Sequence, residues 1–213
     1  MDMSETYVVT SDVGGKSMPT SMTVAPAEAT MRPSALLALD AGAGVNAPLL
    51  ADLLSSFLAH ERCGVHLYRT VEGMTQDPEW AAKFREFGEQ TKEHVRILES
   101  LVLQLGGDPM YVSPAARLTE ALDSKLLETL LVSGSFDAAT LEVACIEAVL
   151  QGERKCHANW EFLRQLADSL PGGSAASALR SAVDAVESQE DEHVRWAELA
   201  WQGALRSGLM TAA

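Results

Sequence analysis

Glu190 and His193 are a pair of residues whose types and spacing could bind a metal ion. They are three residues apart, so on a helix the carboxylate and the imidazole project from the same face. Carboxylate oxygen and imidazole nitrogen both bind divalent transition metals, and helical bundles use the Glu-x-x-His unit for this purpose. A motif this short also arises by chance. Its meaning therefore depends on the residues that face it from other helices.

An internal duplication identifies those facing residues. Residues 93–96 and residues 192–195 both read Glu-His-Val-Arg, which aligns His94 with His193. Further matching pairs are Gln90 with Gln189, Glu99 with Glu198, and Glu61 with Glu153. Two copies are too few for a solenoid. The duplication instead predicts two related helical hairpins that pack with pseudo-twofold symmetry.

Acidic and imidazole side chains occupy the middle of each predicted helix, on its apolar face. They are Glu61, His94, Glu153, Glu190 and His193. Burying an unpaired carboxylate costs several kcal/mol, and no Lys or Arg shares these faces to neutralise the charge. A divalent cation would neutralise it, so the pattern predicts a metal site. The alternative is a hydrogen-bonded polar layer without metal.

Four long helices must position these residues. Apolar residues recur at alternating steps of three and four over residues 48–74, 78–105, 138–170 and 174–206. Asp77 and Asp137 are the expected N-caps of the second and third helices. The connection over residues 110–136 is long and is expected to hold one or two short helices. We therefore predict an all-α four-helix bundle over residues 47–213, with one long crossover connection.

Over residues 49–206 the chain resembles the ferritin-like superfamily, especially its rubrerythrin-like and bacterioferritin-like branches. The resemblance rests on the Glu-x-x-His unit, on the single glutamates of the first and third helices, and on the long crossover. It implies that Glu61 and Glu153 are terminal carboxylate ligands and that Glu190 bridges two ions. It also implies that His94 and His193 are imidazole ligands.

Thr91 departs from the family pattern, which has a second bridging glutamate three residues before His94. Glu89 and Glu93 are each displaced from the face that carries the site. Three outcomes stay open. Water or hydroxide replaces the missing bridge between two ions, a single ion binds to a subset of the ligands, or the site binds nothing or only adventitious zinc.

The resemblance implies a cofactor of one or two iron ions, with manganese as the alternative metal, and a homodimer. Dioxygen or peroxide would be the reaction partner of a ferroxidase- or peroxidase-like non-haem di-iron oxidoreductase. The sequence assigns no catalytic residue. The rival hypothesis is a non-catalytic stress or scaffold protein whose helical bundle keeps a degenerate metal site. An iron-storage cage is a further rival.

Composition argues against several other classes. The 213 residues include 30 acidic and 16 basic ones, for a net charge of −14, which disfavours nucleic acid and anionic membranes as partners. No stretch approaches the roughly 18 consecutive apolar residues of a membrane-spanning helix. The sequence shows no secretory signal, and its three cysteines have no CxxC spacing. We expect a cytoplasmic protein with reduced thiols.

The first 46 residues have no sustained periodicity and are rich in Ser, Thr, Gly, Ala and Pro. We predict a disordered tail over residues 1–46, with a docking peptide as the alternative.

Several residues near the predicted ligands receive a structural interpretation. His157 is expected to be a partly exposed histidine, with an additional metal ligand as the alternative, and His60 and His66 are expected at a surface or interface. Tyr68 and Trp160 are interpreted as core aromatics, with a redox relay as the alternative. Cys156 is expected to pack as a small apolar residue and not to bind metal.

Overall fold

A computed structural model describes residues 6–13, 16–23, 45–132 and 137–210. Five helices occupy the two longer ranges: α2 (Ala47–Met74), α3 (Pro78–Gln104), α4 (Pro114–Val132), α5 (Ala138–Ser169) and α6 (Ser174–Leu209). Every regular element in those two ranges is a helix, which confirms the all-α prediction for them. The long helices lie within a few residues of the predicted ranges because Gly and Pro residues interrupt the apolar periodicity sharply.

Two strands, β1 (Thr6–Val13) and β2 (Lys16–Thr23), pair antiparallel in the N-terminal segment. The sequence analysis predicts no strand there. β1 is rich in Thr and Val, and these branched side chains favour extended backbone, which accounts for the difference. Residues 1–5, 14–15 and 24–44 lie outside the described residues, so the predicted disorder of the tail stays a prediction.

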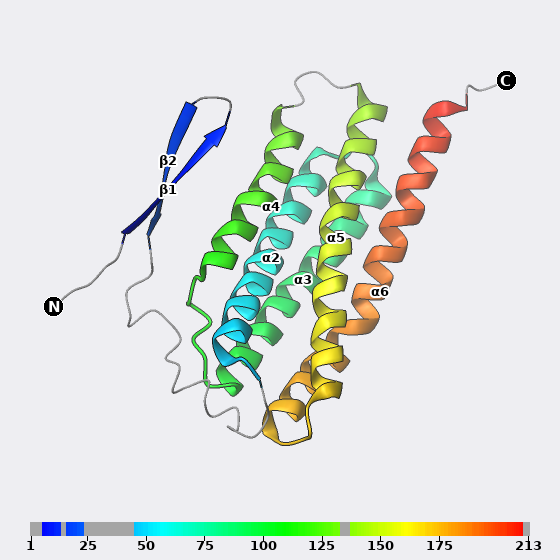
Figure 1. Cartoon of the computed structure of the whole chain (residues 1–213). Coiled ribbons are helices and arrows are strands. Elements are labelled where there is room, and N and C mark those ends of the chain that lie inside the picture. Colours follow the sequence, from blue (N-terminus) through cyan, green and yellow to red (C-terminus); the bar gives the residue numbers. More distant parts are fainter. Residues whose placement is uncertain (1–5, 14–15, 24–44, 133–136, 211–213) are drawn as a thin grey trace.

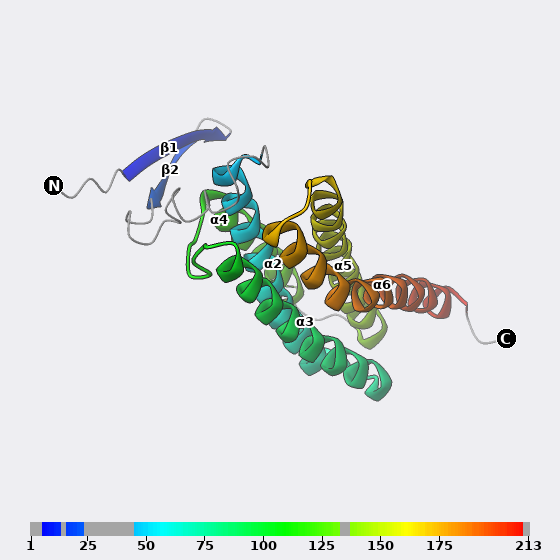
Figure 2. The same ribbon diagram turned by 90° about the horizontal axis from the view of Figure 1, so that it is seen from below.

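The helices pack as two pairs. α2 lies against α3, and α5 lies against α6; the pairs meet where α2 lies along α5 and α3 along α6. Helix α4 packs on α2 and also touches α5 (Figure 1). Seen from below, α4 and α6 lie at opposite sides of the group of five helices (Figure 2). Helices α2, α3, α6 and α5 therefore surround a shared interior, and α4 covers part of its outer side.

Helix α4 differs from its prediction. The sequence predicts one or two short helices within residues 110–136, whereas the structure has one helix that is longer than expected, with 19 residues. No Gly or Pro occurs within α4 after Pro114, so the helix continues once it has begun. The connection leading into it is fixed to α2, because the Ser55 hydroxyl donates to the carbonyl of Tyr111 and accepts from the amide of Ser113.

The apolar core is divided into two parts. The first apolar cluster includes Leu54, Leu58, Leu98, Leu101, Trp160, Leu163, Leu179 and Val183. The second apolar cluster includes Tyr68, Val71, Phe84, Phe87, Ile146, Val149 and Ala197. On each of the four surrounding helices, the residues between the two clusters include the acidic or imidazole side chains singled out above. The fold therefore holds a polar layer between two apolar ones.

Local signals fix where the helices begin and end. The carboxylate of Asp77 accepts from the backbone amides of Glu79 and Trp80, and that of Asp137 accepts from Thr140, which confirms both predicted N-caps. At the other end of α3, Gly106 has φ of 81°, which glycine adopts without steric cost. The amide of Gly107 bonds back to the carbonyl of Val102, which closes the last turn.

Replacement of Asp77 by alanine is expected to lower the free energy of unfolding by about 1 kcal/mol, because two amide donors at the start of α3 lose their acceptor. Urea unfolding followed by circular dichroism measures the change. Glu147→Ala, an exposed substitution in the middle of α5, is the control and should leave stability within about 0.5 kcal/mol of wild type. Equal effects of the two substitutions would contradict the capping role.

Candidate metal centre

The structure brings together all five side chains that the sequence analysis selects as metal ligands. Glu61 comes from α2, His94 from α3, Glu153 from α5, and Glu190 with His193 from α6. Each is at most 5% exposed. The two imidazole rings stack with their centroids 5.7 Å apart. Whether these residues bind metal stays a prediction, but their convergence in one buried layer meets its geometric requirement.

One group of potential ligand atoms lies around Glu61. Glu61, Cys156 and Glu190 offer ligand atoms that all lie within 4.8 Å of one another. His94 Nδ1 lies 2.9 Å from Glu190 Oε1 and 3.8 Å from Glu61 Oε2. Two atoms that each lie about 2.0–2.3 Å from one ion are separated by at most about 4.6 Å, so the spacing in this group is close to that of ligands around a single ion.

A second group lies beside the first and shares Glu190 with it. Glu153, Glu190 and His193 also offer ligand atoms within 4.8 Å of one another. His193 Nδ1 lies 3.2 Å from Glu153 Oε2. The carboxylate of Glu190 therefore stands where it could contact an ion in either group.

Two glutamine side chains set the orientation of the imidazole rings. His94 Nε2–H donates to Gln189 Oε1 at 2.8 Å, and His193 Nε2–H donates to Gln90 Oε1 at 2.6 Å. Because an amide oxygen only accepts, each Nε2 carries a proton. Each ring therefore presents Nδ1 to the carboxylates, and Nδ1 is the nitrogen that would bind a metal ion once it carries no proton.

Two aromatic side chains hold the outer carboxylates. The Tyr68 hydroxyl on α2 donates to Glu153 Oε1 at 2.7 Å, and Trp160 Nε1 on α5 donates to Glu61 Oε1 at 2.7 Å. Both aromatics are buried as the sequence analysis predicts, but it misses these hydrogen bonds. The duplication could have indicated them, since each aromatic follows the glutamate of its own helix by seven residues. Each bonds the glutamate of the opposite helix.

Three buried polar atoms in the centre have no hydrogen-bond partner. They are Glu61 Oε2, His94 Nδ1 and Glu190 Oε2. Although His94 Nδ1 is close to Glu190 Oε1, the pair is not aligned as a hydrogen bond. Leaving such atoms unsatisfied in a protein interior is costly, and native proteins rarely do it. A cation among them would satisfy all three, so the donor set fits a divalent metal.

Burial and mutual repulsion govern the charge of the carboxylates. Burial, together with the charge of Glu190, raises the pKa of Glu61 to about 7. Burial and the charge of Glu153 raise the pKa of Glu190 to about 8. Burial also opposes ionisation of Glu153, but hydrogen bonds from His193 and Tyr68 outweigh it and lower the pKa of that carboxyl. Glu61 and Glu190 are therefore the two carboxylates whose negative charge lacks compensation within the protein.

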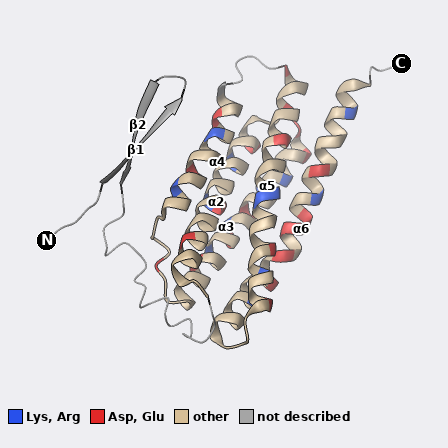
Figure 3. Cartoon of the chain, viewed as in Figure 1, with Lys and Arg blue, Asp and Glu red and all other residues tan. Residues whose placement is uncertain are grey.

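Arginines near the centre are directed elsewhere, as predicted. Arg62 pairs with Glu99, and Arg154 pairs with Glu198; the four residues match one another in the duplication. Figure 3 shows basic and acidic residues mixed along the helix exteriors. These exposed pairs contribute little to stability, and neither arginine pairs with a carboxylate of the buried centre.

Thr91 lies beside the centre, but its hydroxyl forms a hydrogen bond within its own helix. It is buried, and its hydroxyl donates to the carbonyl of Phe87 one turn earlier. Its methyl group packs so close to Gly64 that a Cβ at that glycine would lie 3.3 Å from it. In the duplication Thr91 matches Glu190, and Gly64 matches Cys156. One half of the centre thus has the carboxylate of Glu190 and the thiol of Cys156. At the matching positions the other half has only the hydroxyl of Thr91, because Gly64 has no side chain.

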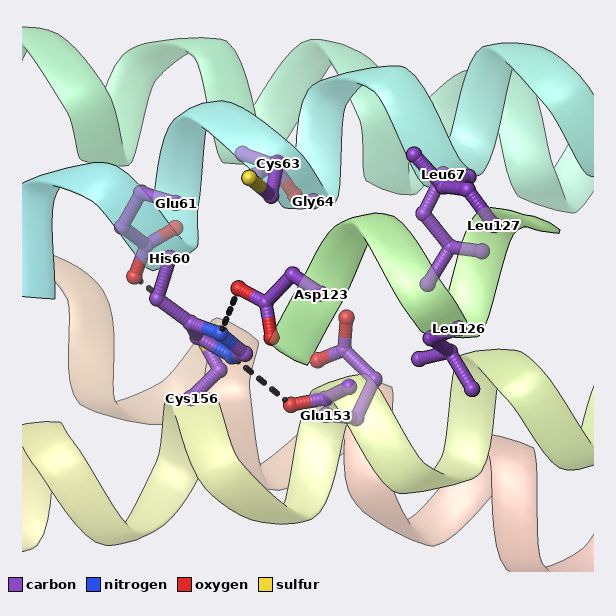
Figure 4. Close-up of a pocket in the computed structure, with 12 residues that line it drawn as sticks. His60, Glu61, Cys63, Gly64, Leu67, Asp123, Leu126, Leu127, Glu153 and Cys156 are labelled. Carbon is purple, nitrogen blue, oxygen red and sulfur yellow. Dashed lines mark hydrogen bonds and ion pairs between the residues drawn. The ribbon is translucent and has the colours of Figure 1, made fainter. Parts of the chain in front are cut away.

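A cavity of about 20 Å³ adjoins the centre on the Gly64 side, between α2, α4 and α5 (Figure 4). Its walls include Glu61, Thr91 and Glu153 on the side of the centre, and Leu126 and Leu127 of α4 on the outer side. A cavity of this size holds a molecule about as large as water. Space thus remains near the position where Thr91 replaces the expected glutamate.

His60 is buried, which corrects the prediction of a surface or interface position. Its Nδ1 bonds Asp123 of α4 at 2.8 Å, and its Nε2 bonds the carbonyl of Gly152 in α5 at 3.0 Å. Burial alone would lower the pKa of His60, but the hydrogen bond and charge of Asp123 outweigh it and raise the pKa. The prediction is wrong because the sequence does not show where the connection over residues 110–136 docks, and α4 within it covers this face.

The remaining histidines agree with their structural interpretation. His66 is exposed. His157 is half-buried and its Nε2 lies 2.9 Å from Asp191, in an ion pair outside the centre. Neither belongs to the two groups of ligand atoms described above.

Comparisons with known proteins identify no relative. No family model matches the chain, and no curated protein or solved structure matches it significantly. None of the described helices combines the length and apolar character needed to cross a bilayer. The case for function therefore rests on the geometry of the centre.

Asp123→Ala is expected to lower the free energy of unfolding by about 2–3 kcal/mol, because it leaves the buried ring of His60 without its carboxylate partner. Chemical denaturation measures this loss. Lys125→Ala on the same helix removes an exposed pair with Glu128 and should change stability by less than about 0.5 kcal/mol. If both variants were equally stable, the ion pair would not be what fixes α4.

Proposed function

We propose that this chain is a ferritin-like four-helix metalloprotein that binds two iron or manganese ions and carries out oxygen- or peroxide-linked redox chemistry. The observation that carries the proposal is the carboxylate of Glu190. It belongs to two groups of buried ligand atoms, and its Oε2 has no partner within the protein. A bridging position between two cations accounts for both facts.

The arrangement of helices supports the ferritin-like bundle. Helices α2, α3, α6 and α5 surround the centre, and the chain passes from α3 to α5 through a long segment that contains α4. The hydrogen bonds that Gln90 and Gln189 accept from the histidines, and those that Tyr68 and Trp160 donate, cross between the two hairpins in matching pairs. Such reciprocity is expected of a pseudo-twofold bundle that grew from a duplicated hairpin.

Each proposed ion has its own terminal ligands. Glu61 and His94 would hold one ion, and Glu153 and His193 would hold the other. Glu190 would contact both. The loss of a second bridging carboxylate at Thr91 leaves fewer protein ligands than the family pattern provides, so this side of the centre offers open coordination next to the cavity.

Iron or manganese, when bound, would supply the electrons exchanged with dioxygen or peroxide. The chain's own residues bind, orient and shield. Tyr68 and Trp160 hold the outer carboxylates in place, and the two glutamines fix the imidazole tautomers. The apolar side chains of Leu67, Leu126 and Leu127 enclose the cavity, which admits only a small reactant. This size favours dioxygen or peroxide over a bulkier substrate.

Glu190→Ala is the direct test of the centre. Purified without a metal-chelating tag and loaded anaerobically with ferrous ion, wild type should hold up to two ions per chain and melt at a higher temperature than the metal-free protein. In the variant, bound metal should fall at least about tenfold and added metal should no longer raise the melting temperature. Glu187→Ala, exposed on the same helix one turn earlier, is the matched control and should behave as wild type.

Turnover is measured on the same samples. Oxidation of bound ferrous ion by dioxygen or peroxide should be faster in wild type than in Glu190→Ala. If wild type binds no metal, and added metal does not change its melting temperature, the result would instead support the hypothesis of a non-catalytic helical protein. Metal binding without any faster oxidation would leave a metal site that lacks the proposed chemistry.

Thr91→Glu should restore the missing bridge. The added carboxylate would face the cavity between Gly64 and the centre, so we expect tighter metal binding and a stoichiometry of two ions per chain by titration calorimetry. Lys92→Glu is the control, because it introduces a glutamate at the next position in the chain, where the side chain is exposed. No gain in affinity or stoichiometry over that control would mean that position 91 does not face the ions.

A further inference from the structure

Cys156 lies within the proposed centre, although its sequence context predicts only a packing role. It is 6% exposed, and its sulfur lies 2.8 Å from Glu61 Oε1 and 3.5 Å from Glu190 Oε1. The three side chains offer ligand atoms that lie within 4.8 Å of one another. The thiol is therefore as close to the carboxylates as the imidazole of His94 is.

The other oxygens of these carboxylates give an independent indication of a ligand. Glu61 Oε2 and Glu190 Oε2 have no hydrogen-bond partner, and both residues are at most 2% exposed. A thiol is a weak donor, and a single S–H cannot compensate two carboxylates. A cation bound by sulfur and by both carboxylates would compensate all three groups at once.

The duplication explains why a sixth ligand would come from this position. Cys156 occupies the place of Gly64, and Glu190 occupies the place of Thr91. The half of the centre built around Gly64 and Thr91 has lost a ligand relative to the family pattern. The half built around Cys156 and Glu190 has a sulfur in addition to its carboxylate. A sixth donor is thus present, but it comes from the other hairpin than the one in which the carboxylate is missing.

We propose that Cys156 is a thiolate ligand of the ion held by Glu61, His94 and Glu190. This inference rests on the proposed function, since it requires that the centre bind metal. The two ions are then chemically different, because only one has a sulfur ligand. Thiolate favours softer metals such as iron or zinc over manganese or magnesium, so the two positions differ in metal preference.

The binding step is balanced by the loss of one proton. In the metal-free protein the S–H of Cys156 donates to Glu61. When the metal–sulfur bond forms, that proton leaves to solvent, and the sulfur contributes one negative charge to the ion.

The other cysteines provide matched controls. Cys145 is fully buried in the second apolar cluster, away from both groups of ligand atoms. Cys63 is half-buried and lines the cavity, but it belongs to neither group. Replacement of each cysteine by alanine therefore separates a role in the centre from general effects of thiol removal.

Cobalt(II) is a suitable probe, because thiolate coordination gives it an intense near-ultraviolet charge-transfer band that carboxylate and imidazole ligands do not give. The full-length chain is loaded with cobalt(II) in a buffer that contains a phosphine reductant. The phosphine keeps the cysteines reduced, and no added thiol competes for the metal. Wild type, Cys63→Ala and Cys145→Ala should show the band. Cys156→Ala and Cys156→Ser should lose it, while still binding cobalt through the carboxylates and imidazoles.

The outcomes distinguish this inference from the proposed function. Cobalt binding by wild type without the charge-transfer band would overturn the thiolate ligand and leave the metal centre intact. A band that persists in Cys156→Ser would also overturn it, and the cysteine whose loss removes the band would be the ligand instead. Wild type that binds no cobalt, iron or manganese would overturn both proposals. The wild-type spectrum alone decides whether sulfur coordinates, and cobalt binding retained by Cys156→Ser shows that loss of its band is not caused by misfolding.

Discussion

The burial of three carboxylates and two imidazoles in one layer is the constraint on which the rest of the structure depends. Apolar clusters lie on both sides of this layer, so bulk water cannot solvate the charges. Their burial costs several kcal/mol per uncompensated group. Protons reduce that cost, as the raised pKa values of Glu61 and Glu190 show. A divalent cation would reduce it further and would give the unpartnered atoms a partner.

The hydrogen bonds around the layer hold its members in position before any ion is present. Each imidazole is oriented by a glutamine of the other hairpin, and each outer glutamate by an aromatic donor of the opposite helix. Side chains fixed in this way lose little conformational freedom when they bind a ligand. The layer is therefore preorganised, and its geometry is a property of the duplicated hairpins as a pair.

Within the layer, the symmetry of the duplication is broken at two matched pairs of positions, Thr91 with Glu190 and Gly64 with Cys156, and α4 packs on the side of Thr91 and Gly64. Thr91 packs on Gly64 where the other half has Glu190 next to Cys156. The small side chains on the first side leave a cavity, and α4 encloses it with Leu126 and Leu127. His60 fixes α4 in that place through Asp123. The cavity beside the centre is thus closed on its outer side by a helix that belongs to neither hairpin.

Local sequence patterns were enough to predict the four long helices and the five acidic and imidazole side chains of the polar layer. Helical periodicity, the caps at Asp77 and Asp137, and the repeated Glu-His-Val-Arg segment are local signals, and local signals survive without knowledge of packing. Tertiary structure decided which partners those residues meet. The bonds from Tyr68 to Glu153 and from Cys156 to Glu61 join residues far apart in the chain. The burial of His60 depends on where α4 docks, and no periodicity encodes that position.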